Sequence, residues 1–335
     1  MSKNIKTISI IGDGGWGTTL AVHLARNKRA VTLWGPFADY LRQMKKTRHN
    51  TKFLPGIRLP EGIGLTTDLK SALETGDLIV FAVPSKYAAA VLRKIKKTSV
   101  DLSSKIILSV TKGIDTTKLL RISEIIRREL GPIPVAVLSG PTIAYEVAQG
   151  LPSTAVVASR NIALARKIQA VFNAASFRIY TNTDVIGTEL GGSIKNIIAL
   201  ACGVCDGLGF GSNTKAAILT RGLAEMARLG AAMGARQRTF SGLTGLGDLV
   251  TTCVSPKSRN RTVGEQLGRG KLIKTILSHM DMVAEGVETV KAVHKLSHRY
   301  NVSMPITTEV YNIIYRNKKP SQAVADLMKR KMKAE

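Results

Sequence analysis

The sequence predicts an α/β fold, in which a mostly parallel sheet domain is followed by an all-α domain. In the first half, short and continuously apolar segments alternate with helical segments, which is typical of a parallel sheet buried on both faces. After about residue 185 this strand pattern ends and only helical patterns follow. We therefore expect two domains, residues 1–185 and 186–335, and a chain of 335 residues is long enough for both.

The expected strands are apolar runs that end in turn signals. The first of them runs into a glycine-rich turn and then into a helix over residues 18–27. In chain order, the strands are expected within residues 7–11, 30–34, 77–85, 105–113, 134–142, 153–159 and 176–184. The helices of the second domain are expected over residues 188–205, 214–234, 260–269, 284–300 and 306–315. The stretch "GLTGLGD" is expected to be a glycine-rich break between two of these helices.

The chain carries a formal net charge of +26, which attracts anions. The charges are spread along the chain, with no zinc-finger spacing, aromatic RNA-binding signature or basic zipper pattern. An anionic small ligand therefore explains the charge better than a nucleic-acid partner does. No apolar run approaches the roughly 20 residues of a membrane span, and the N-terminal apolar run "ISII" is too short for a signal peptide. We expect a cytoplasmic protein without stable membrane insertion.

The cysteines and histidines predict neither a disulfide framework nor a metal site. Three cysteines is an odd number, and the pair Cys202 and Cys205 continues an apolar helix pattern, which favours core packing over redox chemistry. His294 and His298 have helical spacing, but no third ligand accompanies them. We expect them on a helix surface or at an interface, and we expect no metal.

Residues 12–17 read "GDGGWG" and predict a dinucleotide site of the Rossmann type. The stretch follows a strand and opens a helix, as this motif requires. Gly12 permits the tight turn, Gly14 lets the backbone approach a pyrophosphate, and Gly17 allows the helix to pack closely on the strand. The alternative is a turn with only a structural role.

Two features of this region bear on the choice of cofactor. Asp13 places a carboxylate inside a loop that should bind phosphate, which is unfavourable unless the side chain points away. The second strand ends in "VTLWGPF", with no acid to bind the ribose hydroxyls of NAD and no basic pair for a 2′-phosphate. Exclusive use of NAD is therefore disfavoured, and use of NADPH or of both cofactors is expected.

Three strand ends of the first domain should lie at the ligand crevice of an open α/β sheet. Lys112 stands where a strand delivers its last side chain, and its alternative is an ordinary surface lysine. Gly140 and Thr142 precede a helix whose N-terminus can receive an anion. Thr142 is equally compatible with a plain N-cap.

Lys195 lies in the helix expected near residues 189–203. The apolar stripe of that helix is formed by Leu190, Ile194, Ile197, Ile198 and Ala201. Lys195 lies beside Gly191, Gly192 and other small residues, which we interpret as room for a ligand. A partly desolvated lysine can act as an acid or base near neutral pH. The alternative is a lysine at the edge of the stripe that extends its ammonium group to water.

Two later clusters supply possible partners for this lysine. Asp248 follows a glycine-rich turn and can pair with a cation. The start of a later helix carries Ser258, Arg259, Asn260 and Arg261, and such hydroxyl, guanidinium and amide donors suit a phosphate. A capped helix with a solvated basic start is the alternative for this second cluster.

Taken together, these segments resemble the bacterial-type NAD(P)-dependent glycerol-3-phosphate dehydrogenase family. The segments occur in the family's order over almost the whole chain. They are "IIGDGGWGTTLA", "FLPGIRLP", "FAVPS", "TKGI", "SGPTIAYEVAQGLP", "GGSIKNIIALACGVCDGLGFGSNTKAAILTRGLAEM", "GLTGLGDLVTTC", "SRNRTVGEQLG" and "VAEGVET". The resemblance implies reversible reduction of dihydroxyacetone phosphate to sn-glycerol 3-phosphate for phospholipid synthesis, with NADPH or NADH as cofactor.

The resemblance also implies roles for individual residues. Lys195 matches the proton donor and acceptor, and Lys112 lies at the nicotinamide and the substrate. Beside these implied roles, our own candidate for the group that orients Lys195 is Asp248. The positions that match substrate contacts are Lys112, Gly140, Thr142, Lys195, Asp248, Ser258, Arg259 and Asn260. Those that match cofactor contacts, beyond Gly12, Gly14, Gly17 and Lys112, are Gly15, Trp16, Pro36, Ala144, Arg259, Val283 and Glu285.

Three positions depart from the family pattern. The family commonly has Ala where this chain has Asp13, Ser where it has Gly15, and a polar residue where it has Pro36. The side-chain hydroxyl on the pyrophosphate is lost at Gly15, although the backbone amide remains.

Two other interpretations remain at this point. One is a β-hydroxyacid dehydrogenase relative with a phosphate-free substrate, and the other is a non-catalytic protein that binds nucleic acid or a membrane surface. For the dehydrogenase we expect a phosphorylated three-carbon substrate, no nucleic-acid partner and a homodimer.

Overall fold

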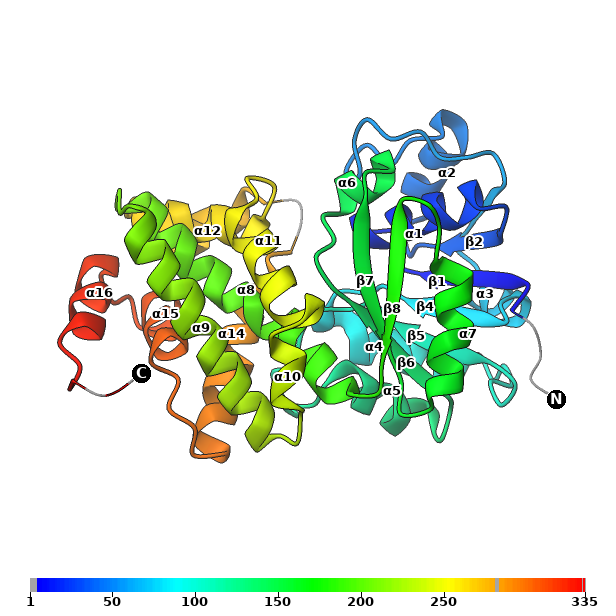
Figure 1. The fold of residues 1–335 in the computed structure, drawn as a ribbon. Coiled ribbons are helices and arrows are strands. Elements are labelled where there is room, and N and C mark those ends of the chain that lie inside the picture. Colours follow the sequence, from blue (N-terminus) through cyan, green and yellow to red (C-terminus); the bar gives the residue numbers. More distant parts are fainter. Residues whose placement is uncertain (1–4, 281–282, 333, 335) are drawn as a thin grey trace. The chain divides into compact units, whose positions relative to one another are not determined.

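The computed structural model describes residues 5–280, 283–332 and 334. The described chain forms two compact units, which we treat separately. The first contains the residues up to Lys112 and Leu120–Thr188, and the second contains Gly113–Leu119 and the residues from Glu189 onward. Figure 1 shows the sheet with its helices and the group of helices that follows it in the chain.

The first unit is built on one eight-stranded sheet with the order β3-β2-β1-β4-β5-β6-β7-β8. The strands are β1 (Thr7–Ile11), β2 (Ala30–Trp34), β3 (Ile63–Thr66), β4 (Leu78–Phe81), β5 (Ile106–Ser109), β6 (Val135–Ser139), β7 (Ser153–Ala158) and β8 (Phe177–Asn182). All neighbouring pairs are parallel except β6 and β7. The mostly parallel sheet and all seven expected strands are confirmed. The sequence did not predict β3, because its four residues "IGLT" are too short and too glycine-interrupted to stand out.

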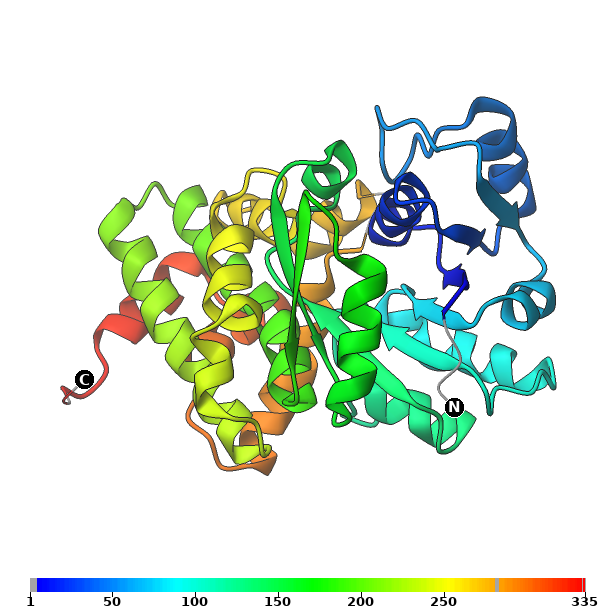
Figure 2. The same cartoon turned by 45° about the vertical axis from the view of Figure 1, so that its right-hand side comes forward.

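Helices cover both faces of this sheet. They are α1 (Gly15–Arg26), α2 (Ala38–Thr47), α3 (Leu69–Thr75), α4 (Ser85–Lys97), α5 (Ile122–Leu130), α6 (Ala144–Gln149) and α7 (Ile162–Phe172). Buried side chains of α1, α2, α6 and α7 share one core with the sheet, and those of α3, α4 and α5 share another. Along β4 the side chains alternate between the two cores, with Val80 in the first and Phe81 in the second. Figure 2 shows the same sheet from a second direction.

The second unit is helical. Its elements are α8 (Val185–Gly207), which begins in the first unit, α9 (Ser212–Ala232), α10 (Gln237–Phe240), η1 (Leu243–Gly247), α11 (Asp248–Val254), α12 (Arg259–Gly268), α13 (Ile273–Ser278), α14 (Glu285–Arg299), α15 (Pro305–Tyr315) and α16 (Pro320–Met328). The five expected helices are present with ends shifted by up to three residues. The expected break "GLTGLGD" was wrong, because its residues form the π-helical turn η1 that runs directly into α11. The sequence did not predict the short helices α10, α11 and α13, or the C-terminal helix α16.

Helix α8 is the central helix of the second unit. By length and composition α8 could cross a membrane. The sequence did not predict this, because no continuous apolar run in it approaches that length. However, 94% of the most apolar 18-residue stretch of α8 is buried inside the protein, so the helix belongs to the core of the second unit. Lys195 near its middle is itself only 5% exposed.

Helices α8 and α12 meet along a seam of glycines. A β-carbon on Gly203 or Gly207 would overlap the backbone of α12, and one on Gly264 or Gly268 would overlap the backbone of α8. Such small residues, four apart on both helices, allow the two backbones to approach closely. The seam fixes the start of α12 relative to α8, and both elements carry predicted site residues.

The cysteines and histidines have the structural roles that the sequence indicated. Cys202, Cys205 and Cys253 are free and buried, and burial, with smaller contributions from Cys202 and Asp206, raises the pKa of the Cys205 thiol to about 12. The predicted core packing of Cys202 and Cys205 is therefore confirmed. His294 and His298 lie on α14, where His294 stacks on the Tyr311 ring. Among the described residues, no group of three metal-binding side chains is found.

Candidate active site

The glycine-rich turn between β1 and α1 has the geometry that its sequence predicts. Gly12 has a φ of +122°, and a β-carbon there would approach the Ala82 carbonyl oxygen to 2.7 Å. A β-carbon on Gly17 would overlap the Gly12 carbonyl oxygen, so this glycine lets α1 pack on the loop. Gly14 is the N-cap residue of α1, and apart from its neighbours in the chain no described residue comes within 4 Å of a β-carbon built on it. The amide end of a twelve-residue helix is therefore open to an anion, as a dinucleotide pyrophosphate requires.

The neighbouring positions explain one departure from the family pattern. A β-carbon on Gly15 would come within 2.6 Å of the Phe53 carbonyl oxygen, so this loop has no room for the family's serine. Trp16 packs against the first core, and its buried indole Nε1 has no hydrogen-bond partner among the described residues. Pro36 is exposed, two residues after the end of β2.

Asp13 points into the protein. Its side chain is only 6% exposed, and its carboxylate lies against Gly35, where a β-carbon would overlap both Oδ2 and Cγ. Burial raises the pKa of this carboxyl group, and a hydrogen bond from its own backbone partly opposes the shift. The carboxylate thus avoids the phosphate-binding side of the loop and approaches the end of β2 instead.

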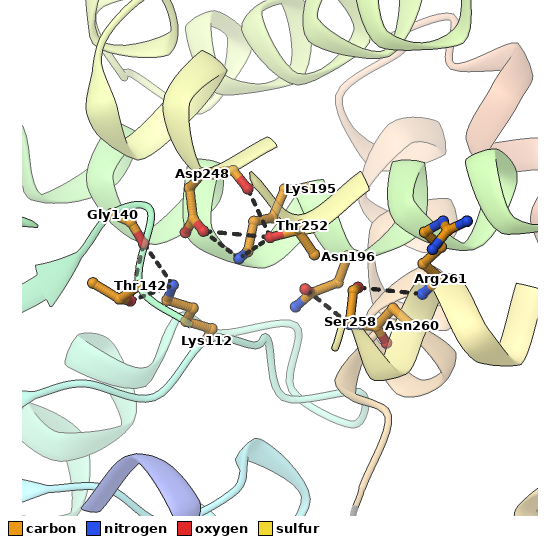
Figure 3. Close-up of polar contacts among 10 residues, drawn as sticks. All are labelled: Lys112, Gly140, Thr142, Lys195, Asn196, Asp248, Thr252, Ser258, Asn260 and Arg261. Carbon is orange, nitrogen blue, oxygen red and sulfur yellow. Dashed lines mark hydrogen bonds and ion pairs between the residues drawn. The ribbon is translucent and has the colours of Figure 1, made fainter. Parts of the chain in front are cut away.

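Lys112 and the turn after β6 form the second group of predicted residues. The Lys112 ammonium donates to the Gly140 carbonyl at 3.0 Å and to Thr142 Oγ1 at 3.4 Å (Figure 3). Gly140 has a φ of +144°, and a β-carbon there would come within 2.9 Å of Ala155 Cα. Ala144 begins α6, and its carbonyl accepts a hydrogen bond from Thr19 Oγ1 at 3.0 Å. The structure therefore brings Lys112, Gly140 and Thr142 together.

Lys195 in the second unit forms a buried ion pair with Asp248. Its ammonium donates to Asp248 Oδ1 and, at 2.6 Å, to Thr252 Oγ1 (Figure 3). The Thr252 hydroxyl in turn donates to the Asp248 carbonyl at 2.7 Å, as a threonine four residues along a helix can. Lys195 and Asp248 are 5% and 1% exposed, so bulk water barely solvates either charge. The alternative interpretation, in which Lys195 extends its ammonium group from the edge of the apolar stripe to water, is therefore wrong.

The interpretation of Gly191 as room for a ligand is also wrong. A β-carbon on this residue would overlap the Thr244 carbonyl oxygen in η1. The glycine instead allows η1 to lie directly on α8. Since α11 continues from η1, this close approach places Asp248 beside Lys195.

The residue after Lys195 connects α8 to the start of α12. Asn260 Nδ2 donates to Asn196 Oδ1 at 3.0 Å, and Asn260 Oδ1 accepts from the Gly286 amide at 2.9 Å. Ser258 is the N-cap of α12, with its hydroxyl oxygen accepting from the Arg261 amide at 3.3 Å. The alternative of a capped helix start is therefore confirmed for Ser258, although its own hydroxyl proton remains available as a donor.

Arg259 connects the start of α12 to the segment before α14. Its Nη1 donates to the Val283 carbonyl at 2.8 Å. Although part of the residue is exposed, desolvation lowers the pKa of its guanidinium, and the nearby Glu285 carboxylate opposes this shift. Arg259, Val283 and Glu285, which the resemblance assigns to the cofactor, are thus brought together. Arg261 turns away and forms an ion pair with Asp206 at 2.6 Å.

Sequence reasoning missed two residues of this site. Thr252 touches the Lys195 ammonium, and its signal is the four-residue spacing from Asp248 on one helix. Asn196 orients Asn260, and its signal is its position beside Lys195 in an otherwise apolar helix. Both are small polar side chains that need a tertiary partner before their role is evident.

Comparisons with known proteins agree over nearly the whole chain. Models described as the N-terminus and the C-terminus of NAD-dependent glycerol-3-phosphate dehydrogenase match residues 7–165 and 184–325. A protein of Prosthecochloris aestuarii named glycerol-3-phosphate dehydrogenase (NAD(P)+) is 47% identical over 331 residues, which cover 98% of this chain and 99% of the relative.

Solved structures with the same name have the same fold. The crystal structure of glycerol-3-phosphate dehydrogenase from Coxiella burnetii is 39% identical, with a TM-score of 0.93, over 97% of this chain and 99% of that one. The Plasmodium falciparum glycerol-3-phosphate dehydrogenase is 28% identical, with a TM-score of 0.88, over 99% and 97% of the two chains. The chain therefore belongs to the NAD-dependent glycerol-3-phosphate dehydrogenase family.

Proposed function

We propose that this chain catalyses the reversible NAD(P)H-dependent reduction of dihydroxyacetone phosphate to sn-glycerol 3-phosphate. The observation that carries the proposal is the buried Lys195–Asp248–Thr252 group, because it holds an ammonium group in a fixed orientation inside a helical core. The relatives named as glycerol-3-phosphate dehydrogenases support the substrate and the cofactor. The product is the backbone of glycerophospholipids, and phospholipid synthesis is its proposed use.

The two parts of the chain have different roles in this proposal. Residues 1–185 would supply most of the cofactor contacts, and the pyrophosphate would lie at the open N-terminus of α1, at Gly12, Gly14 and Gly17. The other contacts proposed for the cofactor are Gly15, Trp16, Pro36, Lys112, Ala144, Arg259, Val283 and Glu285. When bound, the reduced nicotinamide supplies the hydride that the carbonyl carbon receives. Residues 186–335 hold the substrate.

Lys195 is the proposed proton donor for the reduction. As negative charge develops on the carbonyl oxygen, the ammonium group stabilises it and transfers a proton, and in the reverse direction the amine accepts that proton. Asp248 and Thr252 fix the direction of the ammonium group through the two contacts described above. Lys112, held by Gly140 and Thr142, adds positive potential at the reacting end of the substrate.

The substrate phosphate is assigned to the start of α12. Arg259 uses one of its five N–H donors on Val283, which leaves its other donors for phosphate oxygens. We assign the hydroxyl proton of Ser258 and the second amide proton of Asn260 to the phosphate oxygens as well. The decisive assay follows the absorbance of NADH and of NADPH with dihydroxyacetone phosphate, and oxidation of neither cofactor would contradict the proposal.

Replacing Arg259 with Ala should raise the KM for dihydroxyacetone phosphate about 10- to 100-fold, which is the effect of losing a charge-assisted contact to phosphate. Steady-state kinetics at saturating cofactor measure this change. Arg269→Ala is the matched control, because Arg269 lies at the other end of α12 and is paired with Glu265 at the surface. If Arg259→Ala leaves the substrate dependence unaltered, the phosphate site lies elsewhere.

We also propose that the enzyme is a cytoplasmic homodimer without a nucleic-acid partner. The burial of α8 supports the absence of stable membrane insertion, since its apolar surface is already used within the protein. Light scattering after size-exclusion chromatography should give twice the chain mass of 36.1 kDa. A mass equal to one chain, or recovery of the activity in the membrane fraction at physiological salt, would contradict these assignments.

A further inference from the structure

We propose that Asp13 is a specificity-determining residue that makes this enzyme prefer NADH to NADPH. The inference rests on the proposed function only in that it concerns the cofactor of the same reaction. It reverses the expectation that the missing acid at the end of the second strand disfavours NAD.

The first step is the position of the Asp13 side chain. Its backbone carbonyl is held by two donors, Asn50 Nδ2 at 2.8 Å and Thr18 Oγ1 at 3.1 Å. With the backbone fixed, the carboxylate is turned toward Gly35, the residue directly after β2, and contacts it. The Gly12 amide also donates to the Trp34 carbonyl at 3.0 Å, so the loop and the strand end are fixed to each other.

The second step is the role of that location in dinucleotide folds. Enzymes that use NAD commonly place an acid at the end of the second strand, about 20 residues after the glycine motif, where it binds the ribose hydroxyls. Gly35 occupies this place here, and a side chain at position 35 would begin where the Asp13 carboxylate lies. The acid therefore comes from the glycine-rich loop, and glycine at position 35 leaves the space for it.

The third step is that the described part of the protein leaves one oxygen of this acid without a donor, although the carboxyl group also accepts a hydrogen bond from its own backbone. Asp13 is 6% exposed, and its Oδ2 has no hydrogen-bond donor among the described residues. A buried acceptor without a partner is unfavourable, and the raised pKa of Asp13 has the same origin in burial. The hydroxyls of an adenosine ribose are donors of the kind that this carboxylate lacks.

The same charge acts against a 2′-phosphate. A dianion placed at the ribose would be repelled by the carboxylate, and the residues that follow β2, Gly35, Pro36 and Phe37, include no cation. Arg42 on α2 is paired with Asp39, and Arg48 donates to the Pro60 and Ile63 carbonyls. The described surroundings of the strand end thus favour a hydroxyl over a phosphate.

The test compares the wild type with Asp13→Ala and the isosteric Asp13→Asn. Dissociation constants for NADH and NADPH are measured by fluorescence titration without substrate, and kcat/KM is measured for both cofactors with dihydroxyacetone phosphate. The wild type should prefer NADH at least 10-fold, and both variants should lose about 10- to 100-fold of that preference. Asp101→Asn is the matched control and should keep the wild-type ratio, because the Asp101 carboxylate is exposed in the turn before β5 and accepts hydrogen bonds from Ser103 there.

A second set of variants tests the repulsion directly. Pro36→Arg supplies a cation for a 2′-phosphate at an exposed position, and it should improve NADPH binding much more in the Asp13→Ala background than alone. Equal NADH and NADPH affinities in the wild type, or an unchanged ratio in both Asp13 variants with wild-type thermal midpoints, would overturn the proposal. Because all these proteins are also assayed with dihydroxyacetone phosphate, a failure of the proposed function would appear as absent turnover with either cofactor and not as a changed ratio.

Discussion

Lys195→Ala should lower kcat for dihydroxyacetone phosphate by about 100- to 10,000-fold, the range for loss of a general acid. The ammonium group of Lys195 lies in the helical unit, away from the glycine-rich loop in the sequence, so the dissociation constant for the cofactor should change little. Stopped-flow or steady-state kinetics give the turnover, and fluorescence titration gives the cofactor affinity.

Lys215→Ala is the control for this substitution. Lys215 also pairs with a carboxylate of the same unit, Asp206, but its side chain is 28% exposed and outside the proposed site. Its turnover should stay near that of the wild type. A Lys195→Ala enzyme with near-normal turnover would exclude Lys195 as the proton donor, whatever its effect on stability.

Asp248→Asn should both destabilise the protein and change the pH dependence of turnover. The amide can still accept a hydrogen bond from Lys195, but it no longer supplies the opposite charge, and breaking a buried pair costs about 3–5 kcal/mol of unfolding free energy. Without that charge only hydrogen bonds such as the one to Thr252 still favour the ammonium form of Lys195, so kcat should begin to fall at a lower pH than in the wild type. Urea unfolding and a pH–rate profile measure the two effects.

A double variant separates stability from chemistry at this pair. Lys195→Met with Asp248→Leu replaces both charges by apolar groups, which should restore most of the unfolding free energy while turnover stays low. Asp206→Asn, which weakens a pair nearer the surface, should leave the pH profile unchanged. An Asp248→Asn enzyme with the wild-type profile would show that Asp248 is only a packing partner.

The fold was largely predictable from the sequence because its strands are continuous apolar runs and its long helices are strongly periodic. The failures have a common physical cause. The strand β3 and the short helices α10, α11 and α13 contain too few residues for a period to appear. The turn η1 is glycine-rich, and it lies directly on α8 through a tertiary contact that no local sequence pattern shows.

The site was predictable at the level of residue types but not of contacts. The sequence indicated that Lys195, Asp248 and the start of α12 belong together, yet it assigned the wrong reason to Gly191. A missing β-carbon looks the same in a sequence whether it leaves space for a ligand or for a backbone. Asp13 illustrates the same limit, because its direction depends on the contact with Gly35 across the loop.

The burial of α8 has a consequence for synthesis of the chain. The apolar surface of this helix is complete once Gly207 has left the ribosome, but α12, which closes the glycine seam, ends only at Gly268. At about 5–20 residues per second, the intervening stretch of about 60 residues takes roughly 3–12 seconds to appear. During that interval α8 can pack on α9, η1 and α11, but the face that carries its glycine seam stays uncovered until α12 is complete.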